Sequence, residues 1–351
     1  MVIAFLGQTI IAQEKVAKKI EKSFAMDNAG ELHLENKYGD VSINGWDKDM
    51  LQVIINIEVI HRKKENAKNI LARIDPKITE MGDYINIQTQ IKDKNTGFFA
   101  KYFEKANPFD YDKSNIKINY EIYLPKKAEI ELINSFGDVV IEDWTGKFKG
   151  NIQYGDVWIN EDLNTLDIDL KHGKLRGKTV NYANVRVKNG GVNIESSKDM
   201  RINSSGSEIE IEKVTSLEIF SSKDEINITQ TNSINGDLKF TNIQIYNLIR
   251  EMNLTLKISD LKVNKIDEPD ASIILDQESS EVSINVTDMG LKFEATLEEG
   301  LLRLPKTFKN VDSKLLDKGN RIRKINATYG KNTTGKISIT GKKGVVLLKE
   351  F

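Results

Sequence analysis

Aliphatic residues recur in pairs along most of this chain, with one polar position between the two members of each pair. From residue 192 onward the pairs follow one another every 17 residues. Apolar and polar positions that alternate predict short β-strands with one buried face. A constant spacing predicts a solenoid, because stacked units bury their aliphatic ladders only when the units have matching lengths. The regular pairs are Val192/Ile194, Ile209/Ile211, Ile226/Ile228 and Ile243/Ile245.

A short phrase of an aromatic residue, glycine, aspartate and valine precedes the earlier strands. Gly137, Gly155 and Gly173 are 18 residues apart. We expect each phrase to form a corner in which glycine adopts a backbone conformation that side chains disfavour and aspartate bonds amides of its own turn. The aromatic ring should stack along the outside of the corner or tuck beneath it. The copies are Tyr38-Gly39-Asp40-Val41, Phe136-Gly137-Asp138-Val139, Tyr154-Gly155-Asp156-Val157 and the weaker His172-Gly173.

The remaining pattern divides the chain into regions. Residues 20–46 are predicted to form an opening rung, and residues 126–351 the main solenoid, with a loop insertion near 289–325 where the period breaks. Residues 47–125 are predicted to be a strand–helix–strand–strand insert, with its helix over 62–74. We expect this insert to cap one end of the stack, because a terminal rung exposes unpaired backbone groups.

The predicted fold is therefore all-β: a right-handed parallel β-helix of about 17–18 residues per rung with a small capping insert. Right-handedness follows from the strong preference of parallel crossovers for that sense. The main competitor is an antiparallel sandwich of hairpins, which also has short strands and many turns. The constant period argues against the sandwich, because hairpins need not keep one rung length.

Residues 1–13 form an apolar run without charge until Glu14. This run is too short to span a bilayer and resembles the hydrophobic region and cleavage end of a secretory signal, although a basic leader is missing. A buried first strand is the alternative. We expect export to the periplasm, the cell surface or the medium, and no later stretch qualifies as a transmembrane helix. The absence of cysteine excludes disulfides, thiolate metal sites and a thiol nucleophile.

Charge and metal-ligand patterns narrow the function classes. Lys and Arg (51) nearly balance Asp and Glu (52), so there is no basic excess to hold nucleic acid. The three histidines are scattered. Asp138 and Asp156 could hold calcium, as in glycine-aspartate β-rolls, but the Gly-Gly-x-Gly run and nine-residue period of those repeats are missing. We therefore expect no metal and no cofactor.

Two features are candidates for contact with a glycan or a protein partner. An aromatic-rich segment between two predicted strands contains Phe98, Phe99, Tyr102 and Phe103. Trp158 occupies an outward position by parity and could stack on a sugar ring, or else pack beneath the insert or another subunit. No catalytic constellation emerges from the sequence, so we expect no enzyme.

Three stretches carry a resemblance to a known family: Asn36 to Val41 followed by Trp46, Ile118 to Pro125, and Ile337-Ser338-Ile339 with Gly344-Val345-Val346. Here the chain resembles the auto-transporter-adhesin-like β-helix proteins of unknown function that outer-membrane bacteria export. The resemblance implies a right-handed parallel β-helix, export, and a surface or adhesive role. It offers no catalytic residues, and it weakens after His172, where the aromatic-glycine corner is lost.

These observations favour a non-enzymatic exported protein that binds a surface partner or serves as an envelope scaffold. The alternative is a polysaccharide lyase or glycoside hydrolase on the same scaffold, which predicts carboxylates or a basic residue converging on adjacent rungs. The outward positions vary without such clustering. A periplasmic sensor or assembly partner is a third interpretation, and the ligand and oligomeric state stay open.

Overall fold

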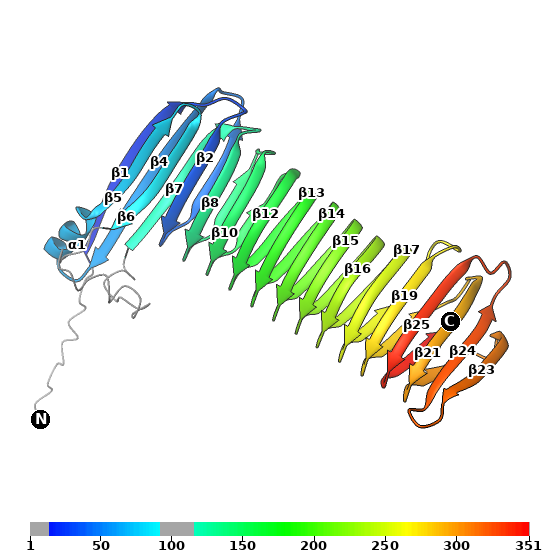
Figure 1. Ribbon diagram of the computed structural model, residues 1–351. Coiled ribbons are helices and arrows are strands. Elements are labelled where there is room, and N and C mark those ends of the chain that lie inside the picture. Colours follow the sequence, from blue (N-terminus) through cyan, green and yellow to red (C-terminus); the bar gives the residue numbers. More distant parts are fainter. Residues whose placement is uncertain (1–13, 92–115, 351) are drawn as a thin grey trace, which may run out of the picture. The chain divides into compact units, whose positions relative to one another are not determined.

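The computed structural model describes residues 14–91 and 116–350. The chain divides into two compact units: unit 1 ends at Trp144 and unit 2 begins at Thr145. The described residues form 26 strands and a single helix (Figure 1). The all-β class is thus confirmed. No helix in the described ranges is long and apolar enough to cross a membrane.

Unit 1 contains nine strands and the helix within its described residues. They are β1 (Glu14–Ala25), β2 (Glu31–Lys37), β3 (Val41–Trp46), β4 (Met50–His61), α1 (Lys64–Leu71), β5 (Ile74–Met81), β6 (Tyr84–Ile91), β7 (Ile116–Pro125), β8 (Glu129–Ser135) and β9 (Val139–Glu142).

The opening rung of unit 1, β2 with β3, lies between two other rungs. β2 pairs in parallel with β6 on one side and with β8 on the other, so that Leu32 faces both Ile85 and Ile130. β3 likewise pairs in parallel with β7 and β9. The insert therefore contributes a rung of its own, β6 with β7, in addition to covering an end.

Antiparallel strands and the helix complete unit 1. β4 pairs with β7, β1 pairs with β4, and β5 pairs with β6, all antiparallel. α1 packs against β1 and β4 and buries Ala67 and Ile70. The insert has one strand more than predicted, because β5 follows the helix directly. Pro76 fits β5 because, among the described residues, this strand pairs with β6 alone, so its other edge needs no amide hydrogen bond.

Unit 2 contains seventeen strands within its described residues. They are β10 (Lys147–Gln153), β11 (Val157–Ile159), β12 (Leu163–Lys171), β13 (Lys174–Lys188), β14 (Gly191–Ser205), β15 (Glu208–Ser222), β16 (Glu225–Lys239), β17 (Asn242–Lys257), β18 (Asp260–Val263), β19 (Ser272–Glu278), β20 (Glu281–Asn285), β21 (Leu291–Glu298), β22 (Leu301–Arg303), β23 (Lys309–Asp317), β24 (Ile322–Tyr329), β25 (Gly335–Lys342) and β26 (Val345–Lys349).

The strands β13 to β17 pair in parallel along almost their whole length, side by side in Figure 1. Leu175 faces Val192, which faces Ile209, so the predicted 17-residue repeat is the observed register. These inward side chains are at most 2% exposed. Where the spacing lengthens to 18, a register shift between Thr231 and Ser233 takes up the extra residue. The pairing is that of a solenoid-like fold, whereas the right-handed sense of coiling stays a prediction.

The last strands of unit 2 do not follow chain order. β25 and β26 pair in parallel with β19 and β20 on one side and with β21 and β22 on the other. β24 then pairs antiparallel with β21, and β23 pairs antiparallel with β24. The segment 289–325, predicted as a loop insertion, therefore holds β21, β22, β23 and the start of β24. Within the described residues, β22 and β23 each pair on one side only.

Candidate functional site

The corners carry their left-handed residue one position earlier than the sequence suggested. The positive φ angles belong to the residues before the glycines: 68° at Tyr38, 61° at Phe136, 56° at Tyr154 and 55° at His172. The expectation that glycine supplies this conformation was wrong. The aromatic residues and the histidine adopt this conformation themselves. It has a steric cost, and the pairing of the surrounding strands maintains it.

Glycine is needed instead for the close approach of stacked corners. A Cβ atom on Gly137 would lie 2.0 Å from the carbonyl oxygen of Gly39, and one on Gly173 would lie 2.0 Å from that of Gly155. No real side chain fits at such distances, so both glycines are fixed by their neighbours' backbones.

Small polar residues replace glycine further along unit 2, which explains why the motif fades without loss of the fold. Asp224 Oδ1 accepts a hydrogen bond from the amide of Ser207 at 2.7 Å. Thr241, Ser259 and Ser280 each accept one, through a side-chain oxygen, from the amide of the equivalent residue in the preceding rung. Asp224 is 5% exposed and also accepts hydrogen bonds from Ser204 and Ser221, so its carboxylate serves the corner.

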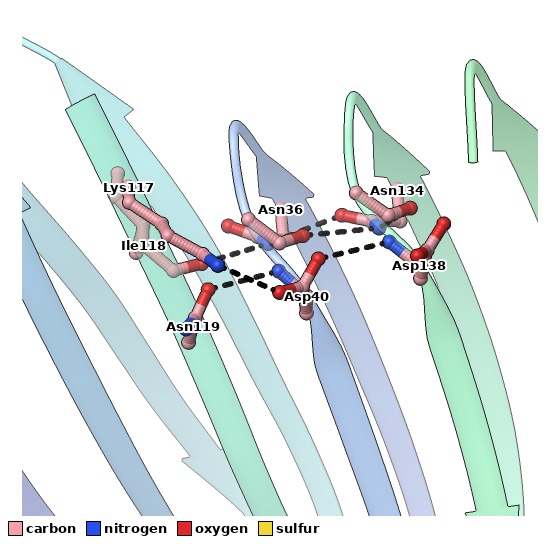
Figure 2. A network of polar contacts seen from close by, with 9 residues as sticks. Asn36, Asp40, Lys117, Ile118, Asn119, Asn134 and Asp138 are labelled. Atoms are coloured by element: carbon pink, nitrogen blue, oxygen red, sulfur yellow. Dashed lines mark hydrogen bonds and ion pairs between the residues drawn. The ribbon is translucent and has the colours of Figure 1, made fainter. Parts of the chain in front are cut away.

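The corner aspartates bond the next rung rather than their own turn, which corrects the second expectation for the motif. Figure 2 shows Asp40 between Lys117 and Asn119 on one side and Asp138 on the other. Asp40 Oδ1 accepts from the amide of Asp138 at 3.1 Å, and Oδ2 lies 3.0 Å from Lys117 Nζ. In unit 2, Asp156 Oδ1 accepts from the amide of Lys174 at 2.8 Å.

Beneath these aspartates of unit 1 lies a buried pair of asparagines. Asn36 Nδ2 donates to Asn134 Oδ1 and to the carbonyl oxygen of Ile118, each at 3.1 Å (Figure 2). Asn134 donates in turn to the carbonyl of Gly137 at 2.8 Å. These bonds satisfy corner carbonyls that would otherwise be buried without a partner. Together with the aspartates they make the corner a structural network.

The structure gives no support to a calcium site at the corners. Within residues 14–91 and 116–350, no group of three or more histidine, aspartate or glutamate side chains is arranged to hold a metal ion.

The aromatic residues of the corners stack on one another. The rings of Tyr38 and Phe136 lie 5.6 Å apart in unit 1, and those of Tyr154 and His172 lie 4.8 Å apart in unit 2. The paired rings are within 15° of parallel, so each covers one face of its neighbour. A sugar ring that stacks face-on would have to use a remaining face or displace a partner.

Of the contact candidates from the sequence, Trp158 is partly covered, and the others fall outside the described residues. Trp158 is half-buried, and the guanidinium of Arg176 lies 5.5 Å from its ring centroid. Arg176 is itself held by Asp156 Oδ2 at 3.1 Å. A sugar would therefore need to displace an anchored cation from Trp158. Phe98, Phe99, Tyr102 and Phe103 lie outside the described residues.

A second surface of unit 2 is formed by outward side chains of β12 to β15, which we call the polar face. Arg186 Nη2 lies 2.7 Å from Asp167 Oδ1 and 3.0 Å from Asp169 Oδ2. The hydrogen bonds to Asp169 and Asp167 raise the pKa of Arg186 further above its ordinary value, so it stays charged. One strand on, Arg201 Nε lies 3.3 Å from Glu218 Oε2. The polar face comprises Asp167, Asp169, Asn184, Arg186, Arg201 and Glu218.

A third surface is a groove at the last strands of unit 2, with a volume of about 820 Å³. One wall is β22, and the other is the β23–β24 hairpin. The antiparallel register places Leu297, Arg323 and Leu315 in one row across β21, β24 and β23. Exposure rises along this row, from 3% at Leu297 to 50% at Leu315. Further aliphatic lining comes from Leu301, Leu302, Leu304, Val311 and Ile325.

One side of this groove is cationic. Residues 299–325 contain eight lysines or arginines and three acidic residues, in a chain whose net charge is −1. Lys318, Arg321 and Arg323 line the groove and form no ion pair with any described residue. The nearby Asp317 accepts hydrogen bonds from the amides of Gly319 and Asn320, and the bond from Asn320 holds the pKa of its carboxyl below the usual range.

The sequence interpretation missed this groove because it balanced charge over the whole chain and treated 289–325 as a loop. Two signals were present. The charge of this short window departs from that of the rest, and Val311, Ser313 and Leu315 alternate as in a strand. What could not be found from the pattern is that β22 and β23 face one hollow.

No protein family and no curated protein matches the chain. Similar solved structures include a "putative cell adhesion protein" from Clostridium sporogenes, 12% identical over 95% of this chain and 100% of that one, with a TM-score of 0.20. A "putative adhesin" from Bacteroides fragilis is 11% identical over 95% and 97% (TM-score 0.32).

A "putative lipid binding protein" from Parabacteroides distasonis is 12% identical over 95% and 96% (TM-score 0.29). The chain is thus similar to solved proteins named as adhesins, which is the kind of protein that the sequence resemblance named. At these TM-scores and identities, neither a shared fold in detail nor a function is transferred to this chain.

Proposed function

We propose that the protein is a non-enzymatic, exported, adhesin-like binding protein on a right-handed parallel β-helix. It would contact a glycan or protein partner through the polar face of unit 2. The observation that carries this proposal is the register of β12 to β15, which places the polar side chains Asp167, Asn184, Arg201 and Glu218 at matching positions on successive strands. Solenoids commonly use such extended surfaces for recognition.

The polar face is suited to binding because its side chains are already held in place. Arg186 is fixed by two aspartates, and Asn184 donates to Asp167 Oδ1 at 3.1 Å. Side chains that are ordered before binding lose less conformational entropy when a partner docks. The strands beneath are stabilised by their inward aliphatic ladder, so outward residues can serve a partner without loss of the core.

The same contacts favour recognition over acid–base chemistry. A general acid or base works best with a pKa near the working pH, which usually requires burial or an uncompensated neighbour. Asp167 and Asp169 are instead partly exposed and paired with a permanent cation. Electrostatic complementarity of this kind contributes mainly to specificity and to the rate of association.

The test compares two double variants of the full chain that lose the same charge. Arg186→Gln with Arg201→Gln removes the cations of the polar face. Lys178→Gln with Lys213→Gln removes two exposed lysines of β13 and β15 outside it. Binding would be measured on arrays of immobilised glycans and proteins and on whole cells. We expect at least about 10-fold weaker binding from the arginine variant, as for loss of charge-assisted hydrogen bonds, and little change from the lysine variant.

The contact candidates from the sequence enter the same assay. Trp158→Ala is combined with Phe98→Ala and Phe99→Ala, and unchanged binding would remove these residues from the proposal. Equal effects of the arginine and lysine variants would remove the polar face. New reducing ends or unsaturated products after incubation with acidic and neutral polysaccharides would show an enzyme instead. Fractionation of cells, with protease protection in each compartment, tests export.

A further inference from the structure

We propose that the groove between β22 and the β23–β24 hairpin binds one single-chain anionic amphiphile. Its alkyl tail would lie along the aliphatic lining, and its carboxylate or phosphate head would contact Lys318, Arg321 and Arg323. This site goes beyond the proposed surface contacts, since it uses different strands of unit 2. It combines, in one hollow, exposed leucines and cations that have no ion-pair partner among the described residues.

The lining selects for an alkyl chain. Leu301, Val311 and Leu315 are 63%, 56% and 50% exposed, although side chains of this kind are usually buried in a folded core. No aromatic residue is among the lining residues, so the groove offers no platform for a sugar ring. Its volume of about 820 Å³ falls within the range of small-molecule sites.

The charges select for an anionic head group. Lys318, Arg321 and Arg323 have no ion-pair partner among the described residues, whereas neighbouring Lys324 contacts Glu294 at 2.6 Å. Glu299 is the one carboxylate on the lining. Asp317 is occupied by the amides of its own turn and does not serve the three cations. Guanidinium groups bind carboxylate and phosphate in a bidentate manner, so an anion would satisfy them well.

An added peptide strand is a weaker fit for the same place. The free edge of β23 carries Lys309, Asp312 and Lys314, and its register with β24 is interrupted twice. Charged residues and bulges on an edge strand are the usual means of preventing further strand pairing. The groove itself lies between β22 and the hairpin, where an alkyl chain needs no backbone hydrogen bonds.

The experiment titrates hexadecanoate, below its micelle concentration, into the full chain by calorimetry. Hexadecanol supplies the tail without the charge, and acetate supplies the charge without the tail. We expect one hexadecanoate per chain, with weaker binding of hexadecanol and no measurable binding of acetate.

Two matched pairs of variants locate the site. Arg321→Gln with Arg323→Gln should weaken hexadecanoate binding about 10- to 100-fold, as for lost charge-assisted hydrogen bonds. Lys309→Gln with Lys314→Gln, on the same hairpin but off the lining, should change it by less than about 2-fold, within the range of a distant surface charge. Leu315→Gln should weaken binding, whereas Leu316→Gln, at nearly equal exposure (51%), should not.

Several outcomes would overturn the site. Equal effects of Leu315→Gln and Leu316→Gln would show that the groove is not used. Equal affinity for hexadecanol would remove the role of the cations. Binding to vesicles of phosphatidylglycerol without binding of free hexadecanoate would make the hairpin a membrane-docking surface. Stronger binding of an acidic peptide than of hexadecanoate would make it a peptide site. Thermal melting of each variant checks folding, and the groove variants should leave binding by the polar face unchanged.

Discussion

The two units cover their terminal parallel rungs with different kinds of cap. In unit 1, β4 has five aliphatic residues with no exposed surface, and α1 packs over this strand and β1. In unit 2, β23 is exposed along nearly its whole length and leaves leucines uncovered. Both add antiparallel strands to parallel rungs. The first buries the whole inner face of β4. The second buries Ile325 and Tyr329 of β24 but leaves the leucines of β23 exposed, so stability alone does not explain β23.

The edge strand β23 of unit 2 is tolerated without being buried. The cap of unit 1 excludes water from Leu51, Ile55 and Val59. The hairpin of unit 2 instead relies on charged residues and on the irregular register between β23 and β24. Aliphatic side chains that remain accessible on such a strand are available to a ligand.

The largest expected effect contrasts one leucine from each cap. Leu51→Ala should lower the free energy of unfolding by about 3–5 kcal/mol, because it opens a cavity in a closed core. Leu315→Ala should lower it by less than about 1 kcal/mol, because the side chain is half exposed. Urea unfolding of both variants beside the original chain measures the contrast. Equal losses would contradict the distinction between the two caps.

A second effect concerns Tyr120 of β7, whose hydroxyl lies 2.7 Å from Thr89 Oγ1. Burial raises the pKa of Tyr120 to about 12, above the ordinary value of 10. The folded state binds this proton more tightly, so its contribution to stability is complete below pH 10 and is lost as the pH rises from 10 to 12. The loss should amount to about 2–3 kcal/mol.

Urea titrations across this pH range test that sign. Tyr120→Phe should flatten the alkaline decline in the stability of unit 1, while Tyr182→Phe, at an exposed position of unit 2, should leave it in place. An unchanged decline in Tyr120→Phe would assign the loss to other groups.

A third effect probes the accessible surface without reference to a natural ligand. The dye 8-anilinonaphthalene-1-sulfonate fluoresces on exposed apolar surface. Leu301→Gln with Leu315→Gln should reduce its emission with the folded protein. Ile274→Gln, at a 47% exposed site of β19, serves as the matched control. Emission that falls equally in both would indicate scattered surface binding rather than a groove.

The smallest effect is expected at the turn of the hairpin. The pKa of the Asp317 carboxyl is held low by hydrogen bonds from Asn320 and Gly319. The turn should therefore be ordered above the ordinary pKa of an aspartate and loosen as the pH falls through the lowered value. Amide NMR shifts of Gly319 and Asn320 should follow this titration, and Asp317→Asn should abolish it. Shifts that titrate unchanged in that variant would refute the assignment.

The repeat was predictable because successive rungs carry aliphatic residues at a nearly constant spacing. Val192, Ile209 and Ile226 occupy one column at the expected register. The corner chemistry was predicted only in outline, because the left-handed residue and the role of glycine depend on how closely two corners approach. The order of the last strands could not be predicted. Periodicity identifies strands, but it does not say that β25 lies between β19 and β21. Gly335 of β25 pairs with Leu291 of β21, 44 residues earlier in the chain (335 − 291).

The position of β25 and β26 between earlier strands affects how unit 2 can fold during translation. β21 to β24 leave the ribosome before β25 and β26, yet β21 and β22 join the preceding rungs of unit 2 only through those later strands. A chain shortened by these two strands would lose an internal layer of unit 2 while keeping the hairpin beyond it. The leucine-lined hollow would then have nothing to rest on, so β25 and β26 must be made before it can form.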